Sequence, residues 1–239
     1  MLTRRLSRRA LYQQVRDVLA SRIAAGEWRP GVALPSEADL ARELGVSSGT
    51  TRKALKLLEA ERLLTRRQGH GTFVTDPASD EHALRYTNIC TGDGERIASE
   101  VEVLEVSKGL ASEAQRNRLG LRPDGETCCI RRVHRCDGEP FIVEEIAMPS
   151  VLFPGLVERG DLSRSIASLA REFGILLGRA EERLSVGAAT EFGAKLLRLP
   201  VGAPILMLDR LIHSVDGTPV EWCLRQAHLD DKYYDAKLD

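Results

Sequence analysis

The sequence predicts an α+β protein with two domains, a small helical domain with a β-hairpin and a larger domain with a mostly antiparallel sheet. Charge is distributed unevenly, since residues 1–76 carry 14 Lys and Arg against 8 Asp and Glu, and residues 77–239 carry 20 against 27. Three helical patterns and a hairpin pattern occupy the first part. The second part repeats itself at an offset of 78 residues. The basic excess at one end indicates a polyanionic partner for the first domain only.

Composition narrows the class of protein. A hydrophobic content of 43% and a charged content of 29% are typical of a globular protein in water. No apolar run approaches the roughly 20 residues of a membrane helix, so no membrane partner is expected. The five cysteines form no CxxC pair and the five histidines are scattered, which predicts free thiols in a reducing cytoplasm, no metal and no cofactor. The Arg-rich start leads into an amphipathic pattern, which argues against a signal peptide.

Three helices are expected in the first domain. Apolar residues recur at helical spacing from Leu11, and this pattern ends at Gly26. Ser36 can cap the second helix, and Asp39 three residues later completes a capping box. After a tight glycine turn, a third helix is expected over residues 47–62.

A basic hairpin follows the third helix. Residues 63–67 and 72–75 have the pattern of two short strands joined by the tip 68–71. Two helices with a tight turn between them and a basic hairpin behind them form a helix-turn-helix with a wing. The alternative is a three-helix structural subdomain with an incidental basic face. Hydroxyl groups at the helix start can approach phosphates and bases, Arg and Lys add charge and reach, and glycines let the wing backbone come near a groove. The residues predicted to contact double-stranded DNA are Ser36, Ser47, Ser48, Thr50, Thr51, Arg52, Lys53, Arg66, Arg67, Gln68, Gly69, His70 and Gly71.

Residues 11–74 carry a series of short motifs in a characteristic order. These motifs are Leu34-Pro35-Ser36-Glu37, Leu40-Ala41, Val46-Ser47, Thr50, Arg52, Ala54-Leu55, Leu58-Glu59 and Arg67-Gln68-Gly69-His70-Gly71-Thr72-Phe73-Val74. On these residues the domain resembles the DNA-binding domain of the GntR family of bacterial transcription regulators. Two positions depart from the common pattern: Ser48 stands where many members carry a guanine-reading Arg, and Ala38 where many carry an Arg beside the DNA backbone. The resemblance therefore implies the family's fold but not its usual operator half-site.

The domain boundary is expected after the hairpin. Asp76-Pro77-Ala78-Ser79-Asp80 is a polar segment with a helix breaker, and the charge balance changes sign across it. We therefore assign residues 1–76 to the DNA-binding domain, 77–80 to a linker and 81–239 to a second domain.

The second domain is predicted to consist of two related halves. Gly109, Ala111, Glu113, Leu119 and Leu121 match Gly187, Ala189, Glu191, Leu197 and Leu199, and after a one-residue adjustment Arg131, His134, Asp137-Gly138 and Pro140 match Arg210, His213, Asp216-Gly217 and Pro219. Each half is expected to form a strand, a short helix, a strand and an Asp-Gly hairpin into another strand. The expected strands are 98–106, 127–135, 141–145, 181–186, 205–215 and 220–224. A cleft between two such halves is a natural ligand site.

Three residues of this domain form a candidate binding site. Arg132 and His134 alternate onto one face of a strand, and Glu144 lies on the paired strand. A cation, an imidazole and a carboxylate on neighbouring strands can recognise a small polar anion. The alternative is a structural one, in which Arg132 and Glu144 form a cross-strand ion pair and His134 is an ordinary sheet residue.

Residues 85–233 also carry scattered family marks. They are Arg132, Asp137-Gly138-Glu139-Pro140, Glu144, Met148-Pro149, Ser165, Leu169, Phe173-Gly174, Leu196-Leu197, Pro200, Gly202, Pro204, Arg210, Gly217, Pro219-Val220-Glu221, Asp231 and Tyr233. On these residues the domain resembles the UTRA effector domain of the HutC branch of GntR regulators, which implies a fold similar to that of chorismate lyase. The resemblance implies that Arg132, His134, Glu144, Ser165 and Glu221 line the effector pocket. His134 stands where a second Arg is common, which weakens the case for a phosphorylated ligand.

The leading hypothesis is a regulator of transcription rather than an enzyme. It is a repressor that a small polar or anionic metabolite releases from its operator. We expect a homodimer on an inverted repeat, because one short recognition helix makes few base contacts. The runner-up is an enzyme, since the implied fold also houses a lyase, but the sequence has no GxSxG, HExxH, P-loop or dinucleotide motif. A third hypothesis, an architectural DNA-binding protein, leaves the large acidic domain unexplained.

Overall fold

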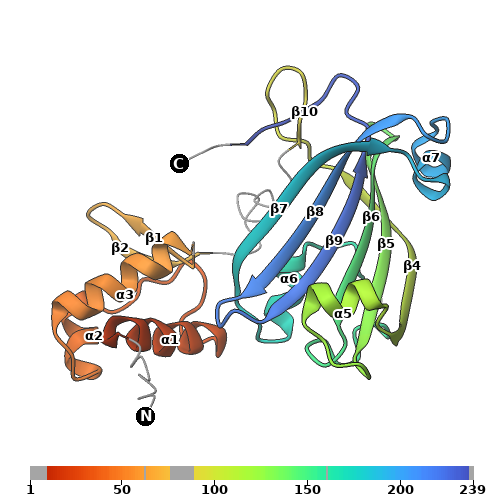
Figure 1. Cartoon of the computed structure of the whole chain (residues 1–239). Coiled ribbons are helices and arrows are strands. Elements are labelled where there is room, and N and C mark those ends of the chain that lie inside the picture. Colours follow the sequence, from red (N-terminus) through yellow and green to blue (C-terminus); the bar gives the residue numbers. More distant parts are fainter. Residues whose placement is uncertain (1–9, 62, 76–88, 160, 237–239) are drawn as a thin grey trace, which may run out of the picture. The chain divides into compact units, whose positions relative to one another are not determined.

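The computed structural model describes residues 10–61, 63–75, 89–159 and 161–236 (Figure 1). Contacts within the chain divide it into two compact units, Met1–Pro77 and Ala78–Asp239. The predicted linker, residues 77–80, lies outside the described residues. No helix in the described ranges is long and apolar enough to cross a membrane.

The first unit contains three helices and a two-stranded sheet. Their bounds are α1 Leu11–Ala24, α2 Glu37–Glu43, α3 Ser48–Ala60, β1 Leu64–Arg67 and β2 Gly71–Val74. Leu19, Leu40 and Leu58 come from the three helices and form the fully buried centre. A core of this kind fixes the helices against one another, because each presents one apolar stripe.

Serine residues begin α2 and α3. Ser36 Oγ accepts the backbone N–H of Asp39, and Ser47 Oγ accepts that of Thr50, both at 3.2 Å. The capping box expected at α2 is only half formed, because the Asp39 carboxylate accepts the Ser36 hydroxyl rather than a backbone N–H. Among the residues that the structure describes, α3 ends at Ala60, slightly before the predicted end.

The wing is attached to the loop that precedes α2. β1 and β2 pair antiparallel from Leu64↔Val74 to Arg67↔Gly71, as the hairpin pattern predicts. Ala33 bridges to Phe73, and Leu34 N–H donates to the Thr72 carbonyl at 2.7 Å. The base of the wing is therefore fixed to the helical core.

The second unit is built around a six-stranded antiparallel sheet (Figure 1). The order across the sheet is β4-β5-β6-β9-β8-β7. The first half contains β4 Glu100–Leu110, α5 Glu113–Leu119, β5 Glu126–Cys136 and β6 Glu139–Pro149. The second half contains β7 Leu177–Ala188, α7 Glu191–Leu197, β8 Pro204–Ser214 and β9 Pro219–Ala227. The predicted duplication is therefore confirmed, and the two halves meet where β6 pairs with β9.

The strands extend further than the sequence predicts, most clearly β6 and β7. β6 is buried along most of its length because it lies at the centre of the sheet, so its sequence does not alternate between polar and apolar residues. Three elements of the described part of this unit lie outside the repeat. They are α6 Ile166–Glu172 and the two strands of a small antiparallel pair, β3 Ile89–Cys90 and β10 Tyr233–Tyr234.

Helices cover both faces of the sheet. On one face, Leu169 of α6 packs with Ile130 of β5 and Met148 of β6. On the other face, Leu119 of α5 packs with Ala147 of β6. We call these the α6 face and the α5 face.

Candidate DNA-binding surface and ligand site

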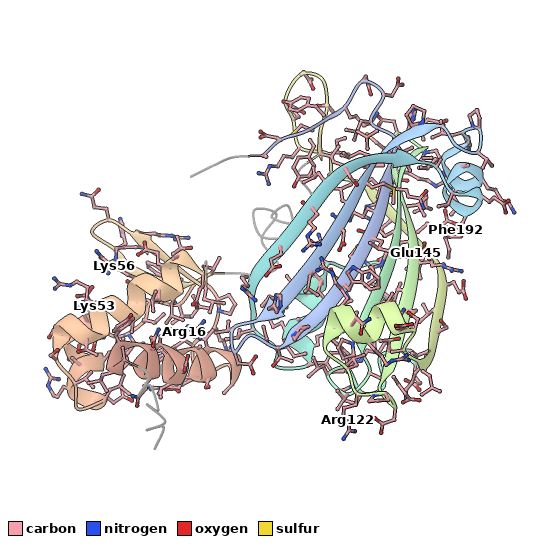
Figure 2. All side chains as sticks on the ribbon, in the orientation of Figure 1. Arg16, Lys53, Lys56, Arg122, Glu145 and Phe192 are labelled. Carbon is pink, nitrogen blue, oxygen red and sulfur yellow. The ribbon has the colours of Figure 1, made fainter. Side chains whose placement is uncertain are left out.

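The start of α3 presents most of the predicted DNA contacts to solvent. Ser47, Ser48, Arg52 and Lys53 are exposed and Thr50 is half-buried. Figure 2 shows Lys53 and Lys56 pointing outward from α3. Hydroxyl groups and cations therefore share the outer face of this helix, an arrangement suited to a groove of DNA.

Thr51 is a correction to the predicted contacts. Its side chain is completely buried (0% exposed), and its hydroxyl lies 3.4 Å from the Ser47 carbonyl. The expectation that Thr51 is exposed is wrong, because the helical period puts it on the same face as Ala54, Leu55 and Leu58, which are also buried. Ser36 and Ser47, also predicted contacts, are the caps of α2 and α3 in this structure.

The wing is exposed from its second strand residue through its tip. The exposed predicted residues here are Arg66, Arg67, Gln68, Gly69, His70 and Gly71. The Arg67 guanidinium stacks over the Phe73 ring, with the guanidinium carbon 4.9 Å from the ring centroid. Gly69 and Gly71 both have positive φ, 75° and 115°, which glycine adopts without strain.

The ligand-site residues lie on the α6 face of the sheet. Arg132 and Glu144 are register partners on β5 and β6, and Glu144 faces Arg225 of β9. Arg210 of β8 and Glu221 of β9 form a second pair, with Arg210 Nη2 2.8 Å from Glu221 Oε1. With His134 these residues make one buried charge cluster: Arg132, His134, Glu144, Arg210, Glu221 and Arg225.

This cluster lies between two apolar groups. Along β6, Ile142 precedes Glu144 and belongs to one apolar group, whereas Ile146 follows it and belongs to the other. Along β8, Leu208 and Ile212 flank Arg210 in the same way. Six ionisable side chains thus share one band of an otherwise apolar interior. Burying charge is costly unless each charge is paired, so such a band is a candidate for function rather than for stability.

Glu144 is the centre of the cluster. Its Oε1 accepts from Arg225 Nε at 2.5 Å, and its Oε2 lies 3.0 Å from His134 Nε2. Ser99 Oγ lies 2.8 Å from the other imidazole nitrogen. Burial is the largest single effect and disfavours the ionised carboxyl, but Arg225, His134 and Arg132 together outweigh it and hold the pKa of Glu144 well below its usual range.

Arg132 is the arginine of the cluster for which the described residues offer no carboxylate within ion-pair distance, although its charge helps to lower the pKa of Glu144. Its side chain is 5% exposed, and Nη1 donates to the Arg164 carbonyl at 3.1 Å. Its Nε is buried without a hydrogen-bond partner in that part of the chain. The simple cross-strand ion pair with Glu144 is therefore not formed, since Glu144 is taken by Arg225 and His134.

Ser165 lies next to this region and caps α6. Its Oγ accepts the backbone N–H of Ser168, and the residue before it, Arg164, supplies the carbonyl that binds Arg132. Sequence reasoning did not assign Arg210, Arg225 or Ser99 to the site. Strand alternation offered a signal for Arg225, which stands four residues after Glu221 and so faces the same side.

A separate cavity of about 320 Å³ opens on the α5 face. Its three charged residues pair with one another, since Arg131 binds both Glu105 and Glu145, and Arg131 also stacks over Phe192. Figure 2 shows Glu145 and Phe192 on this side of the second unit. Since these charges satisfy one another, the buried charge cluster is the stronger candidate for an anion. Among the described residues, no three His, Cys, Asp or Glu side chains gather as a metal site would require.

Comparisons with known families agree with the division of the chain into two units. Residues 11–74 match the family described as "Bacterial regulatory proteins, gntR family", and residues 95–233 match the UTRA domain. The chain belongs to the GntR family, in the branch with a UTRA domain. The GntR and HutC identification made from the sequence is confirmed, as are the α+β fold class and the winged helix.

Named relatives extend over almost the whole chain. The chain is 30% identical to the transcriptional repressor NagR of Bacillus subtilis over 231 residues, 93% of this chain and 92% of that protein. It is 29% identical to MngR of Escherichia coli K12, the mannosyl-D-glycerate transport/metabolism system repressor, over 95% of both chains. GntR-family regulators with a UTRA domain bind DNA and respond to small effectors, so this chain is a ligand-responsive DNA-binding regulator of transcription.

Solved structures show the same fold. PhnF of Mycobacterium smegmatis aligns with a TM-score of 0.57 and 24% identity, covering 94% of this chain and 99% of PhnF. YydK of Bacillus subtilis aligns with a TM-score of 0.55 and 22% identity, covering 96% of this chain and all of YydK.

Proposed function

We propose that this GntR regulator is a repressor that leaves its operator when a small polar anion binds the buried charge cluster. The observation that carries the proposal is Arg132, a buried guanidinium that faces a carboxylate already bound by Arg225. Such a guanidinium can bind two oxygens of a ligand's carboxylate or phosphate group through two parallel hydrogen bonds.

The other predicted pocket residues complete the ligand site in this proposal. His134 and Glu144 offer a donor and an acceptor for hydroxyl groups, and Glu221 and Ser165 add further polar atoms. One unneutralised cation favours a ligand with a single anionic group and a polar or polyhydroxyl remainder. The similarity to MngR, the repressor of a mannosyl-D-glycerate transport/metabolism system, supports a ligand of that chemistry.

The DNA side of the proposal uses the exposed start of α3 and the wing. We assign it Ser36, Ser47, Ser48, Thr50, Arg52, Lys53, Arg66, Arg67, Gln68, Gly69, His70 and Gly71, without Thr51. Two copies of the chain would place two recognition helices on an inverted repeat, since one short helix contacts few bases. We divide the roles at residues 77–80, with DNA binding before them and ligand binding and dimerisation after them. The chain acts in the cytoplasm and binds its effector without converting it.

An operator titration tests this proposal. An operator is first selected with the parent protein from a random duplex library, and ligands are chosen by thermal shift from sugar phosphates, sugar acids and small carboxylates. The best ligand is expected to lower operator affinity in the parent and to have no effect on Arg132→Ala. The matched control is Arg131→Ala, which removes the neighbouring cation on the α5 face and should keep the response. If the ligand still releases Arg132→Ala from the operator at the concentration that releases the parent, the pocket lies elsewhere. Chemical turnover of the ligand would show that the protein is an enzyme.

A further inference from the structure

One carboxylate links three elements of the DNA-binding unit. Glu37 is the first residue of α2. Its Oε2 lies 2.9 Å from Arg52 Nε on α3, and its Oε1 lies 2.7 Å from Arg66 Nη2 on β1. The recognition helix and the wing therefore share a single anionic partner that stands on neither of them.

The carboxylate is less accessible than the cations it binds. The Glu37 side chain is 25% exposed, whereas those of Arg52 and Arg66 are 60% and 41% exposed. Arg52 is bound through Nε, which leaves its two terminal nitrogens for a bidentate contact with a base or phosphate. The hydrogen bond from Arg52 also lowers the pKa of Glu37, so this carboxyl is ionised at neutral pH.

We propose that Glu37 is a positioning residue that aims Arg52 and Arg66 and thereby sharpens the choice between operator and other DNA. The proposal rests on the assignment of both arginines to the DNA surface. An exposed arginine loses rotamer freedom when it contacts a base, and a fixed partner reduces that loss in advance. A negative charge close to phosphates also weakens binding to every DNA sequence. Glu37 thus acts in opposite directions on specific and non-specific binding.

The test compares two charge-neutral variants of the full chain, Glu37→Gln and Asp39→Asn. Both remove one carboxylate from the first turn of α2. Asp39 is the matched control because it binds Arg42 and Ser36 rather than the two proposed DNA-binding arginines. The probes are the best duplex that the parent selects from a random library and a random-sequence duplex of the same length. Affinities are measured over a series of salt concentrations.

Glu37→Gln is expected to bind the random duplex more tightly than the parent, with a salt dependence steeper by about 1 to 2 because up to two more phosphates are contacted. The ratio of selected to random affinity is expected to fall at least about fivefold, the low end for one arginine–base contact. Asp39→Asn is expected to keep that ratio. Glu37→Asp keeps the charge but shortens the reach, and it is expected to lower the ratio without tighter binding to random DNA.

Three results would overturn the proposal. The first is an unchanged ratio in Glu37→Gln, or one that changes equally in Asp39→Asn. The second is a parallel loss of both affinities with a lower melting temperature, which would make Glu37 a structural residue. The third is a Glu37→Asp variant identical to the parent, which would mean that charge alone matters. Failure of the proposed DNA function would look different, since the parent itself would not discriminate between the two duplexes.

Discussion

Arg132 and Glu144 stand opposite each other in the register of β5 and β6, but Glu144 binds Arg225 of β9, with 2.5 Å between Oε1 and Nε. Arg132 is left with the backbone carbonyl of Arg164. A buried guanidinium without a directly bonded carboxylate lowers the stability of the free protein, because one backbone carbonyl replaces only part of its lost hydration. Under the proposed function, Arg132 is available to a ligand, whereas Arg225 pairs with Glu144 within the fold.

Arg132→Met is expected to leave the free energy of unfolding unchanged or to raise it by up to about 4 kcal/mol, since an unneutralised charge is replaced by an apolar side chain. Arg225→Met is the control, because it leaves Glu144 without its main partner and is expected to cost about 3–5 kcal/mol. Urea unfolding followed by circular dichroism measures both. A loss in Arg132→Met as large as that in Arg225→Met would make Arg132 a structural residue.

Glu144→Gln is expected to change how stability depends on pH. The pKa of Glu144 is held well below 4.5 in the folded protein, so its ionised form stabilises the fold above the unfolded pKa, and that contribution is lost as pH falls through the folded pKa. In the parent, stability should therefore decline below about pH 4.5. Glu144→Gln should be less stable at pH 7 and should lack this part of the decline. The control Glu145→Gln breaks a more exposed pair with Arg131 and should follow the parent curve.

The sequence anticipated architecture better than side-chain partners. The 78-residue repeat predicted the two halves of the sheet because strand alternation and Asp-Gly turns are local signals. Strand alternation also placed Arg132 and His134 on one face of a strand, with Glu144 on the paired strand. It could not show that Arg225 rather than Arg132 binds Glu144, because that depends on β6 pairing with β9, about 80 residues away along the chain.

In the DNA-binding unit, too, local features could be predicted from the sequence and long-range side-chain contacts could not. Helix caps at Ser36 and Ser47 follow from local sequence and were predicted in part. Thr51 is predicted at the DNA surface with the other hydroxyl groups at the helix start, although its helical position groups it with the buried Leu55 and Leu58. The bonds of Glu37 with Arg52 and Arg66 join residues 15 and 29 positions apart, so no short motif reveals them.

Thr51→Val is expected to keep the operator affinity of the parent. Valine has nearly the same shape, and the hydroxyl that it removes lies 3.4 Å from the Ser47 carbonyl, a long hydrogen bond. The free energy of unfolding should change by no more than about 1.5 kcal/mol. Thr50→Val is the matched comparison, since Thr50 lies on the proposed surface, and it should weaken operator binding. Equal losses of affinity in both variants would return Thr51 to the interface.

Alanine substitutions of Arg52 and of a wing arginine are expected to affect DNA binding in different ways. Arg52→Ala should cost roughly 1–3 kcal/mol on the selected operator and relax the preference at one base position. Arg67→Ala should weaken binding to all sequences alike and reduce the salt dependence by about 1, because it removes a phosphate contact. Fluorescence anisotropy titrations at several salt concentrations distinguish these results. An unchanged operator affinity in Arg52→Ala would remove this residue from the DNA surface.

Effector and operator are expected to weaken each other's binding by the same factor. A ligand that binds the free and the DNA-bound protein equally shifts no equilibrium, so release from DNA requires a preference for the free form. Thermodynamic linkage then requires that operator weakens effector binding by the same factor, and a coupling of roughly 1–3 kcal/mol is typical of allosteric proteins. Calorimetric titration of the best thermal-shift ligand into the protein, with and without a saturating selected duplex, measures the effect of operator on ligand affinity. The operator titration with and without ligand measures the reverse effect.

Arg131→Ala should show the parent's coupling, because Arg131 lies on the α5 face and is paired with Glu105 and Glu145. Ligand affinity that is the same with and without operator would mean that this ligand does not control DNA binding, even if it occupies the site at Arg132.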